Sequence, residues 1–342
     1  MRRKQRIARF LRKRWLEIVL LLGLSAIVYW FVDLGLTFWP GPALTPTPAA
    51  TVVPAPTALS TRAPAPTTAV TIFSGAGAYQ HVVAQTAFGP RPTGSEAHKE
   101  TGDYIIDTLR DAGWQVQIQE FEYQGTKARN IIGKAGEGTV AIVGAHYDTR
   151  RQADNDSDES RRKEPVMGAN DGASGVAVLL ELAESLNQDA LSHEVWLTFF
   201  DAEDNGGLDG WDFIAGSRYM AEHLDEKPEL VIVADMIGDA DQQIYLERNS
   251  TSLLQNKIWE VADQLGYQEH FIPEYKWSIL DDHTPFLELG LAAVDLIDFD
   301  YPYWHTTADS LDKVSEAALE RVGRVLQVFL EGALPVISTP AT

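Results

Sequence analysis

Short apolar runs of strand length alternate with amphipathic segments of helical length from Phe73 onward. Strands that are separated by helices along the chain are typical of a mainly parallel sheet. The pattern therefore predicts an α/β fold, a three-layer α/β/α sandwich around a mainly parallel, mixed central sheet. The expected strands lie at 114–121, from 130, at 140–145, 194–200, 230–234 and 292–297, and the expected helices lie at 95–112, 173–186, 217–223 and 315–334.

The first 72 residues have a different pattern. Residues 15–39 are largely apolar and reach the roughly 20 residues that a bilayer-spanning helix needs. Eight basic side chains in residues 1–14 precede this span, which predicts a cytoplasmic N-terminus. A cleaved signal peptide is the alternative, but no small-x-small cleavage site supports it. Residues 40–72 are rich in Pro, Thr and Ala and predict a disordered linker. We therefore expect a single-pass membrane protein with its folded domain, residues 73–337, outside the cytoplasm.

Charge and cysteine content narrow the chemistry of that domain. The chain has a net charge of −21; because residues 1–14 carry +8 and residues 15–72 carry −1, the remaining residues carry −28. So acidic a domain repels phosphate, which argues against nucleic acid as a partner. Cysteine is absent, so any metal site must use histidine and carboxylate ligands.

Acidic and histidine side chains follow the predicted strands. In an α/β sheet such positions meet at the carboxyl ends of the strands, where sites form. Carboxylates together with two imidazoles suit zinc, and the number of candidates favours two metal ions that share a carboxylate. An HExxH motif is missing, which excludes the proteases that bind zinc through it, and Ser174 does not lie in a nucleophile elbow. The candidates are His146, Asp148, Asp171, Glu203, Asp204, Asp235 and His305.

Five motifs in this order, GAHYDTR, GANDGASG, FFDAEDNGG, ADMIGD and WHTTAD, resemble the zinc exopeptidase family that contains bacterial di-zinc aminopeptidases and glutaminyl cyclases. Residues 88–114 resemble its N-terminal segment, and the likeness covers about 75–335. The resemblance implies that His146 and Asp235 bind one zinc, that Asp204 and His305 bind another, and that Asp171 bridges them. Glu203 would be the general base, and Asp148 would orient His146. Asp201 is interpreted as structural.

One departure concerns Asp204, where many family members have glutamate. The shorter side chain requires the site to close in slightly, or it binds that metal less tightly. The expected activity is removal of N-terminal residues from peptides by a metal-activated water, with peptides that have free N-termini as partners.

The cyclase branch is the alternative enzyme. The segment Asp281-Asp282-His283, with Trp304 before His305, resembles that branch, in which the counterparts of Glu203, Asp235 and Asp281 relay protons around a single zinc. Trp211 and Trp304 would then shape a small apolar pocket. The presence of His146 favours hydrolysis. A third alternative, a binding ectodomain without catalysis, is disfavoured because Glu203 is intact. The loop 150–165 is interpreted as a solvated loop, with a substrate-selecting rim as the alternative.

Overall fold

The computed structural model describes residues 71–191 and 193–332. The basic segment, the expected anchor at 15–39 and nearly all of the expected linker lie outside these residues. Within the described ranges, no helix is both long enough and apolar enough to cross a membrane.

A six-stranded mixed sheet forms the centre of the fold, with strand order β1-β2-β4-β3-β5-β8. β3, β4, β5 and β8 run parallel, whereas β2 is antiparallel to both β1 and β4. The four parallel strands are almost wholly buried, which explains why they read as continuous apolar runs. The bounds of the six strands are β1 Gln115–Tyr123, β2 Thr126–Ala135, β3 Val140–His146, β4 Glu194–Phe200, β5 Leu230–Asp235 and β8 Ala293–Ile297.

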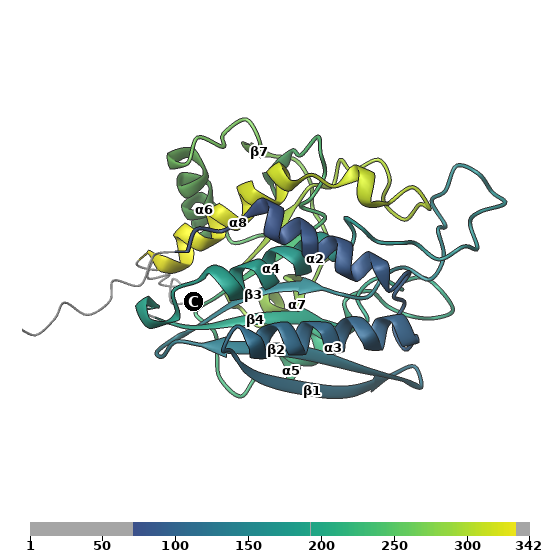
Figure 1. Ribbon diagram of the computed structural model, residues 1–342, viewed down its shortest axis with the longest axis horizontal. Helices are drawn as coiled ribbons and strands as arrows, with labels where there is room; N and C mark the ends of the chain where they lie inside the picture. The colour runs from purple at the N-terminus through teal and green to yellow at the C-terminus, as the bar shows by residue number, and fades with distance from the viewer. Residues whose placement is uncertain (1–70, 192, 333–342) are drawn as a thin grey trace, which may run out of the picture. The chain divides into compact units, whose positions relative to one another are not determined.

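Helices cover both faces of the sheet (Figure 1). Alternate residues of β3 point to opposite faces, so Val143 belongs to the larger apolar core with α2, α3, α4, α6 and α8, while Ile142 belongs to a smaller core with α5 and α7. The mixed α/β fold predicted from the sequence is thus confirmed, with helices on both faces. The helices are α2 Gly75–Ala87, α3 Glu96–Asp111, α4 Ala173–Ser185, α5 Ala215–Glu222, α6 Ser252–Gln264, α7 Thr284–Glu288 and α8 Glu316–Glu331.

Local signals set several element boundaries. The Ser95 side chain accepts a hydrogen bond from the backbone N–H of His98 and caps α3, as predicted. Gln124 and Gly125 both have positive φ, which joins β1 to β2 in a tight hairpin. Sequence analysis did not identify α2, α6, α7, or the small parallel pair β6 (Ile244–Leu246) and β7 (Phe271–Tyr275).

The parallel strands deliver their carboxyl ends to one edge of the sheet. His146 ends β3 opposite Phe200 of β4, and Asp235 ends β5 opposite Ile297 of β8. Gly172 directly precedes α4 beside this edge with φ 94°, and a Cβ there would lie 2.7 Å from the backbone oxygen of Asp148. Only glycine fits this position, so the loop carrying Asp171 can approach the strand ends closely.

Candidate metal centre

His146, Asp171 and Asp235 form the first of two groups with ligand geometry. His146 Nε2 lies 3.2 Å from Asp171 Oδ1 and 3.1 Å from Asp235 Oδ1. One ligand atom from each residue falls within 4.8 Å of the others. The group joins the ends of β3 and β5 to the loop before α4.

Asp171, Asp204 and His305 form the second group. His305 Nε2 lies 2.8 Å from Asp204 Oδ1 and 3.7 Å from Asp171 Oδ2. Asp171 therefore presents one carboxylate oxygen to each group, as a bridging ligand does. The structure brings together all five metal ligands that the sequence analysis named.

The donor set fits zinc. Tetrahedral ligands about 2.1 Å from a zinc ion lie about 3.4 Å apart, close to the spacings of both groups. Asp171 Oδ2 and Asp204 Oδ2 are buried and have no hydrogen-bond partner in the protein. Buried polar atoms are normally satisfied, so these two orphaned carboxylate oxygens fit the binding of a cation by this group.

Crowded carboxylates dominate the electrostatics. Burial, followed by the charge of Asp171, raises the pKa of Asp204 to about 6, and burial followed by Asp281 raises the pKa of Asp235 to about 7. Burial also raises the pKa of Glu203 well above its usual value, assisted by Asp204 and Asp282 against the opposing effect of His146. Burial lowers the pKa of His146, but Asp235 and its other acidic neighbours outweigh it and raise this pKa. A divalent cation would offset this repulsion.

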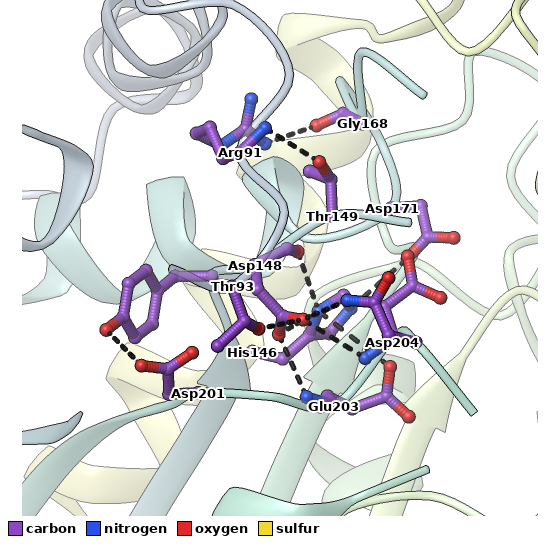
Figure 2. A network of polar contacts seen from close by, with 12 residues as sticks. Arg91, Thr93, His146, Asp148, Thr149, Gly168, Asp171, Asp201, Glu203 and Asp204 are labelled. Carbon is purple, nitrogen blue, oxygen red and sulfur yellow. Dashed lines mark hydrogen bonds and ion pairs between the residues drawn. The ribbon is translucent and has the colours of Figure 1, made fainter. Parts of the chain in front are cut away.

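Asp148 organises the loop after β4. Figure 2 shows its carboxylate surrounded by donors: Oδ1 accepts from the backbone N–H of Glu203 (2.9 Å), and Oδ2 accepts from the backbone N–H of Asp204 (3.3 Å) and the hydroxyl of Thr93 (3.0 Å). His146 Nδ1 lies 3.2 Å from the backbone oxygen of Asp148, and 3.8 Å from its carboxylate. The backbone of Asp148 thus orients His146, while its side chain fixes the positions of Glu203 and Asp204.

Asp201 has a structural environment, as interpreted from the sequence. It is fully buried, and its carboxylate lies 2.8 Å from His98 Nε2 and accepts hydrogen bonds from the Tyr147 hydroxyl (2.9 Å) and the Arg129 backbone (2.7 Å). These contacts tie α3 and β2 to the end of β4.

The loop 150–165 contributes to the site, which the sequence analysis missed. Arg150 is buried and donates to both carboxylate oxygens of Asp154 (2.6 and 2.7 Å) and to the backbone oxygen of Asp204 (2.9 Å). Asp154 in turn faces Nδ1 of His305 at 3.8 Å, on the side of the ring opposite to Asp204. Residues 157–165 are exposed throughout, as expected of a solvated loop, whereas Ala153 and Asp156 are buried.

Two further buried groups, Asp309 at the end of the motif WHTTAD and Arg91 in the segment 88–114, had no assigned role in the sequence analysis. Asp309 accepts hydrogen bonds from the backbone N–H groups of Asn170 (2.9 Å) and Asp171 (3.1 Å), so it positions the shared ligand. Arg91 is fully buried and donates to the backbone oxygens of Met167 and Gly168 (2.9 and 2.8 Å) in the same loop. Both act on the segment that carries Asp171.

Backbone strain concentrates around the site. Ala202, Met236 and His305 all have φ between 47° and 57°, a conformation that non-glycine residues rarely adopt. Ala202 directly precedes Glu203, and Met236 directly follows Asp235. Strained residues persist where the surrounding structure holds them, commonly at functional sites.

A cavity of about 220 Å³ opens above the two groups. Trp304 lines it, as predicted, and so does Asp281 next to Glu203 and Asp235. Trp211 does not line this cavity: its side chain packs edge-on against Tyr123 and beneath Arg151, and it lines an adjoining cavity. Phe213 lines both cavities. The apolar part of the lining is Phe213, Met236, Ile279, Leu280, Ile297, Phe299 and Trp304.

Comparisons with known proteins agree with this geometry. The profile of peptidase family M28 matches residues 130–330. A glutaminyl-peptide cyclotransferase-like protein of Bos taurus is 25% identical over 282 residues, covering 70% of this chain and 71% of that protein. A crystal structure of a leucine aminopeptidase precursor from Bacteroides thetaiotaomicron has a TM-score of 0.73 at 33% identity, covering 77% of this chain and 98% of that one. A glutaminyl cyclase from the same species, bound to N-acetylhistamine, has a TM-score of 0.73 at 32% identity, covering 77% and 99%.

Proposed function

Because the chain belongs to peptidase family M28, we propose that it is a zinc-dependent enzyme that acts on the N-terminal residue of peptides, and that it cyclises N-terminal glutamine. The matches include both a peptidase and cyclases, so the family supports an enzyme of one of these two kinds. The observation that favours cyclisation is the position of Asp281. It lines the same small cavity as Glu203 and Asp235, and hydrolysis gives it no task.

The cavity has the size and lining for one side chain. Its apolar wall, which includes Phe213, Ile279 and Trp304, would hold the methylenes of glutamine and exclude water. Exclusion of water matters because water competes with the substrate amine for the amide carbon. Zinc held by Asp171, Asp204 and His305 would polarise the amide carbonyl when bound.

Glu203 is the proton carrier in this proposal. The substrate's α-amine forms a bond to its own side-chain carbonyl carbon and gives a proton to Glu203. Glu203 then passes that proton to the amide nitrogen as its bond to carbon breaks, and ammonia leaves. Burial, followed by the charge of Asp281, raises the pKa of Asp235 to about 7, so Asp235 can carry a proton beside Glu203, which supports a relay.

Hydrolysis is the second candidate, and the sequence analysis favoured it. It is supported by the second ligand group, His146 and Asp235 with the shared Asp171, which has room for another metal ion. Glu203 would then take a proton from water and pass it to the leaving amine. A binding domain without catalysis has less support, since Glu203 is present and faces the cavity.

In the deciding experiment, the purified full chain is loaded with zinc and given two substrates. One is a peptide with N-terminal glutamine, followed by ammonia release, and the other is leucine anilide, followed by aniline release. Cyclisation predicts ammonia without aniline, lost on chelation and restored by zinc. Aniline without ammonia would replace cyclisation with hydrolysis, and activity that survives complete zinc removal would contradict both.

A further inference from the structure

A second cavity of about 510 Å³ adjoins the catalytic one. Phe213 and Leu280 line both, so the two spaces meet at these side chains. The second cavity lies between the end of β1, the loop 207–215 and α5. Its remaining aromatic lining is Phe121, Tyr123, Trp211 and Tyr219.

Leu280 stands at the junction with 58% of its surface exposed. A single exposed leucine is common on protein surfaces. Leu280, however, lies between two cavities and directly before Asp281. A ligand that leaves the catalytic cavity toward the second one would cover it.

The aromatic walls of the second cavity are held in fixed positions. Phe121 stacks on Tyr219 with ring centres 4.8 Å apart, and Tyr123 meets Trp211 edge-on at 5.3 Å. The Tyr123 hydroxyl donates to Asp212 (2.9 Å), which locks its orientation. Rigid aromatic surfaces bind apolar and aromatic groups at little entropic cost.

The charge of the cavity is acidic. Glu122, Asp212 and Glu222 line it, and its one basic lining residue, Arg218, is paired with Glu288 at 2.6 Å. An acidic group entering this space would meet uncompensated negative charge, whereas an aromatic or long apolar group would not.

We propose that this second cavity is a subsite for the residue that follows the substrate's N-terminal residue, and that it selects peptides with an aromatic or large apolar side chain there. The inference rests on the proposed action at peptide N-termini. It does not depend on which reaction occurs, since cyclisation and hydrolysis both leave the second residue just outside the catalytic cavity.

The test compares kcat/KM for glutaminyl peptides that differ only in the second residue, Phe, Leu, Ala or Glu, with leucyl peptides as a parallel set. We expect Phe and Leu to exceed Ala by about 10-fold or more, the usual scale for filling an apolar pocket, with Glu the poorest. The variants Leu280→Ala and Tyr219→Ala should bring the ratio of Phe to Ala toward one. Leu253→Ala, an equally simple change at an exposed leucine on α6, should leave the ratio unchanged.

Failure of the subsite is distinguishable from failure of the proposed function. Turnover at equal rates for all four second residues overturns the subsite alone. Absence of turnover in both sets overturns the proposed function, and calorimetric titration of the zinc-loaded chain with Gln-Phe amide and Gln-Ala amide then decides the subsite. Equal affinity of the two amides would also overturn it.

Discussion

At the scale of single residues, neighbouring acids in the motif Glu203-Asp204 have different environments. Asp204 contacts His305 and leaves one oxygen orphaned, whereas Glu203 faces the cavity. We therefore expect Glu203→Gln to retain zinc and lose about 10²–10⁴-fold in rate, the scale of a general acid-base group. Asp204→Ala should lose zinc. Elemental analysis measures the bound zinc of each variant, and kinetics measures its rate. A Glu203→Gln protein that binds no metal would reverse the two roles.

Asp281 and His146 discriminate between the two reactions. If the chain is a cyclase, Asp281→Asn removes a charge next to Asp235 and should cost about 10²-fold or more in rate. His146→Ala should then be the milder change, because Asp171, Asp204 and His305 remain. Hydrolysis with two metal ions predicts the opposite order. The readout is kcat for both variants on the substrate that proves active, and a milder Asp281→Asn would return the assignment to hydrolysis.

Asp154, which was not among the predicted site residues, supports the candidate metal ligand His305. It lies between Arg150 and His305, so Asp154→Asn should weaken the orientation of the imidazole. We expect zinc affinity to fall about 10–100-fold, as for other groups that orient metal-bound histidines. Competition with a chelator measures this directly. Glu159→Gln, an exposed change in the same loop, is the control, and equal affinities for the two variants would dismiss the role.

At the scale of elements, buried parallel strands were the easiest to predict. β3, β4, β5 and β8 are nearly continuous apolar runs, and polar residues at their ends mark the site. α2 escaped prediction because its sequence, GAGAYQHVVAQTA, begins with glycines and has little amphipathic contrast. Asp154 and Asp309 follow no strand, so only the folded chain shows that they support the ligands. The sequence also does not show which of the two adjoining cavities Trp211 lines, because its distance along the chain from Glu203 does not reveal on which side of Phe213 it packs.

The contact between α2 and α4 carries a pH dependence of stability. Glu181 of α4 accepts a hydrogen bond from the backbone N–H of Ser74 at the start of α2, and burial raises its pKa to about 7. The folded state thus binds more protons than the unfolded state between about pH 4.5 and 7, so this residue's contribution to stability falls as pH rises through that window. Burial lowers the pKa of His81 to about 4. The contribution of His81 to stability therefore rises as pH rises from about 4 to 6.5, opposite to that of Glu181.

Because these two trends oppose each other, the pH dependence of the unchanged protein does not separate them. The informative quantity is the change in the free energy of unfolding that a single substitution causes at each pH. Glu181→Gln keeps an oxygen for Ser74 and removes the charge, so it should stabilise the protein by about 1 kcal/mol at pH 8 and hardly at pH 4.5. Denaturant unfolding at both pH values measures this. Glu184→Gln, at the half-exposed neighbour, should change little. A Glu181→Gln protein no more stable at pH 8 than at pH 4.5 would contradict the raised pKa.

At the scale of the whole molecule, the charge along the chain is as uneven as its hydropathy. Eight basic residues precede the apolar segment 15–39, and the strongly acidic enzyme domain follows a segment, 40–72, that is rich in proline. Membrane proteins retain their basic flanks in the cytoplasm, which supports an external position for the enzyme domain. A tether of this kind would confine the enzyme to peptides near the membrane surface.

This orientation predicts where a protease can reach the chain. In intact cells that express the chain and have been stripped of any wall, added protease should cut within residues 40–72 and release a fragment that retains the enzyme's activity. The Pro-rich composition of this segment predicts exposed backbone, whereas the packed domain resists cleavage. An epitope placed before Arg2 should stay protected until the cells are lysed. Immunoblotting of both ends measures the outcome. Cleavage of the epitope in intact cells, with the linker protected, would show the reverse orientation.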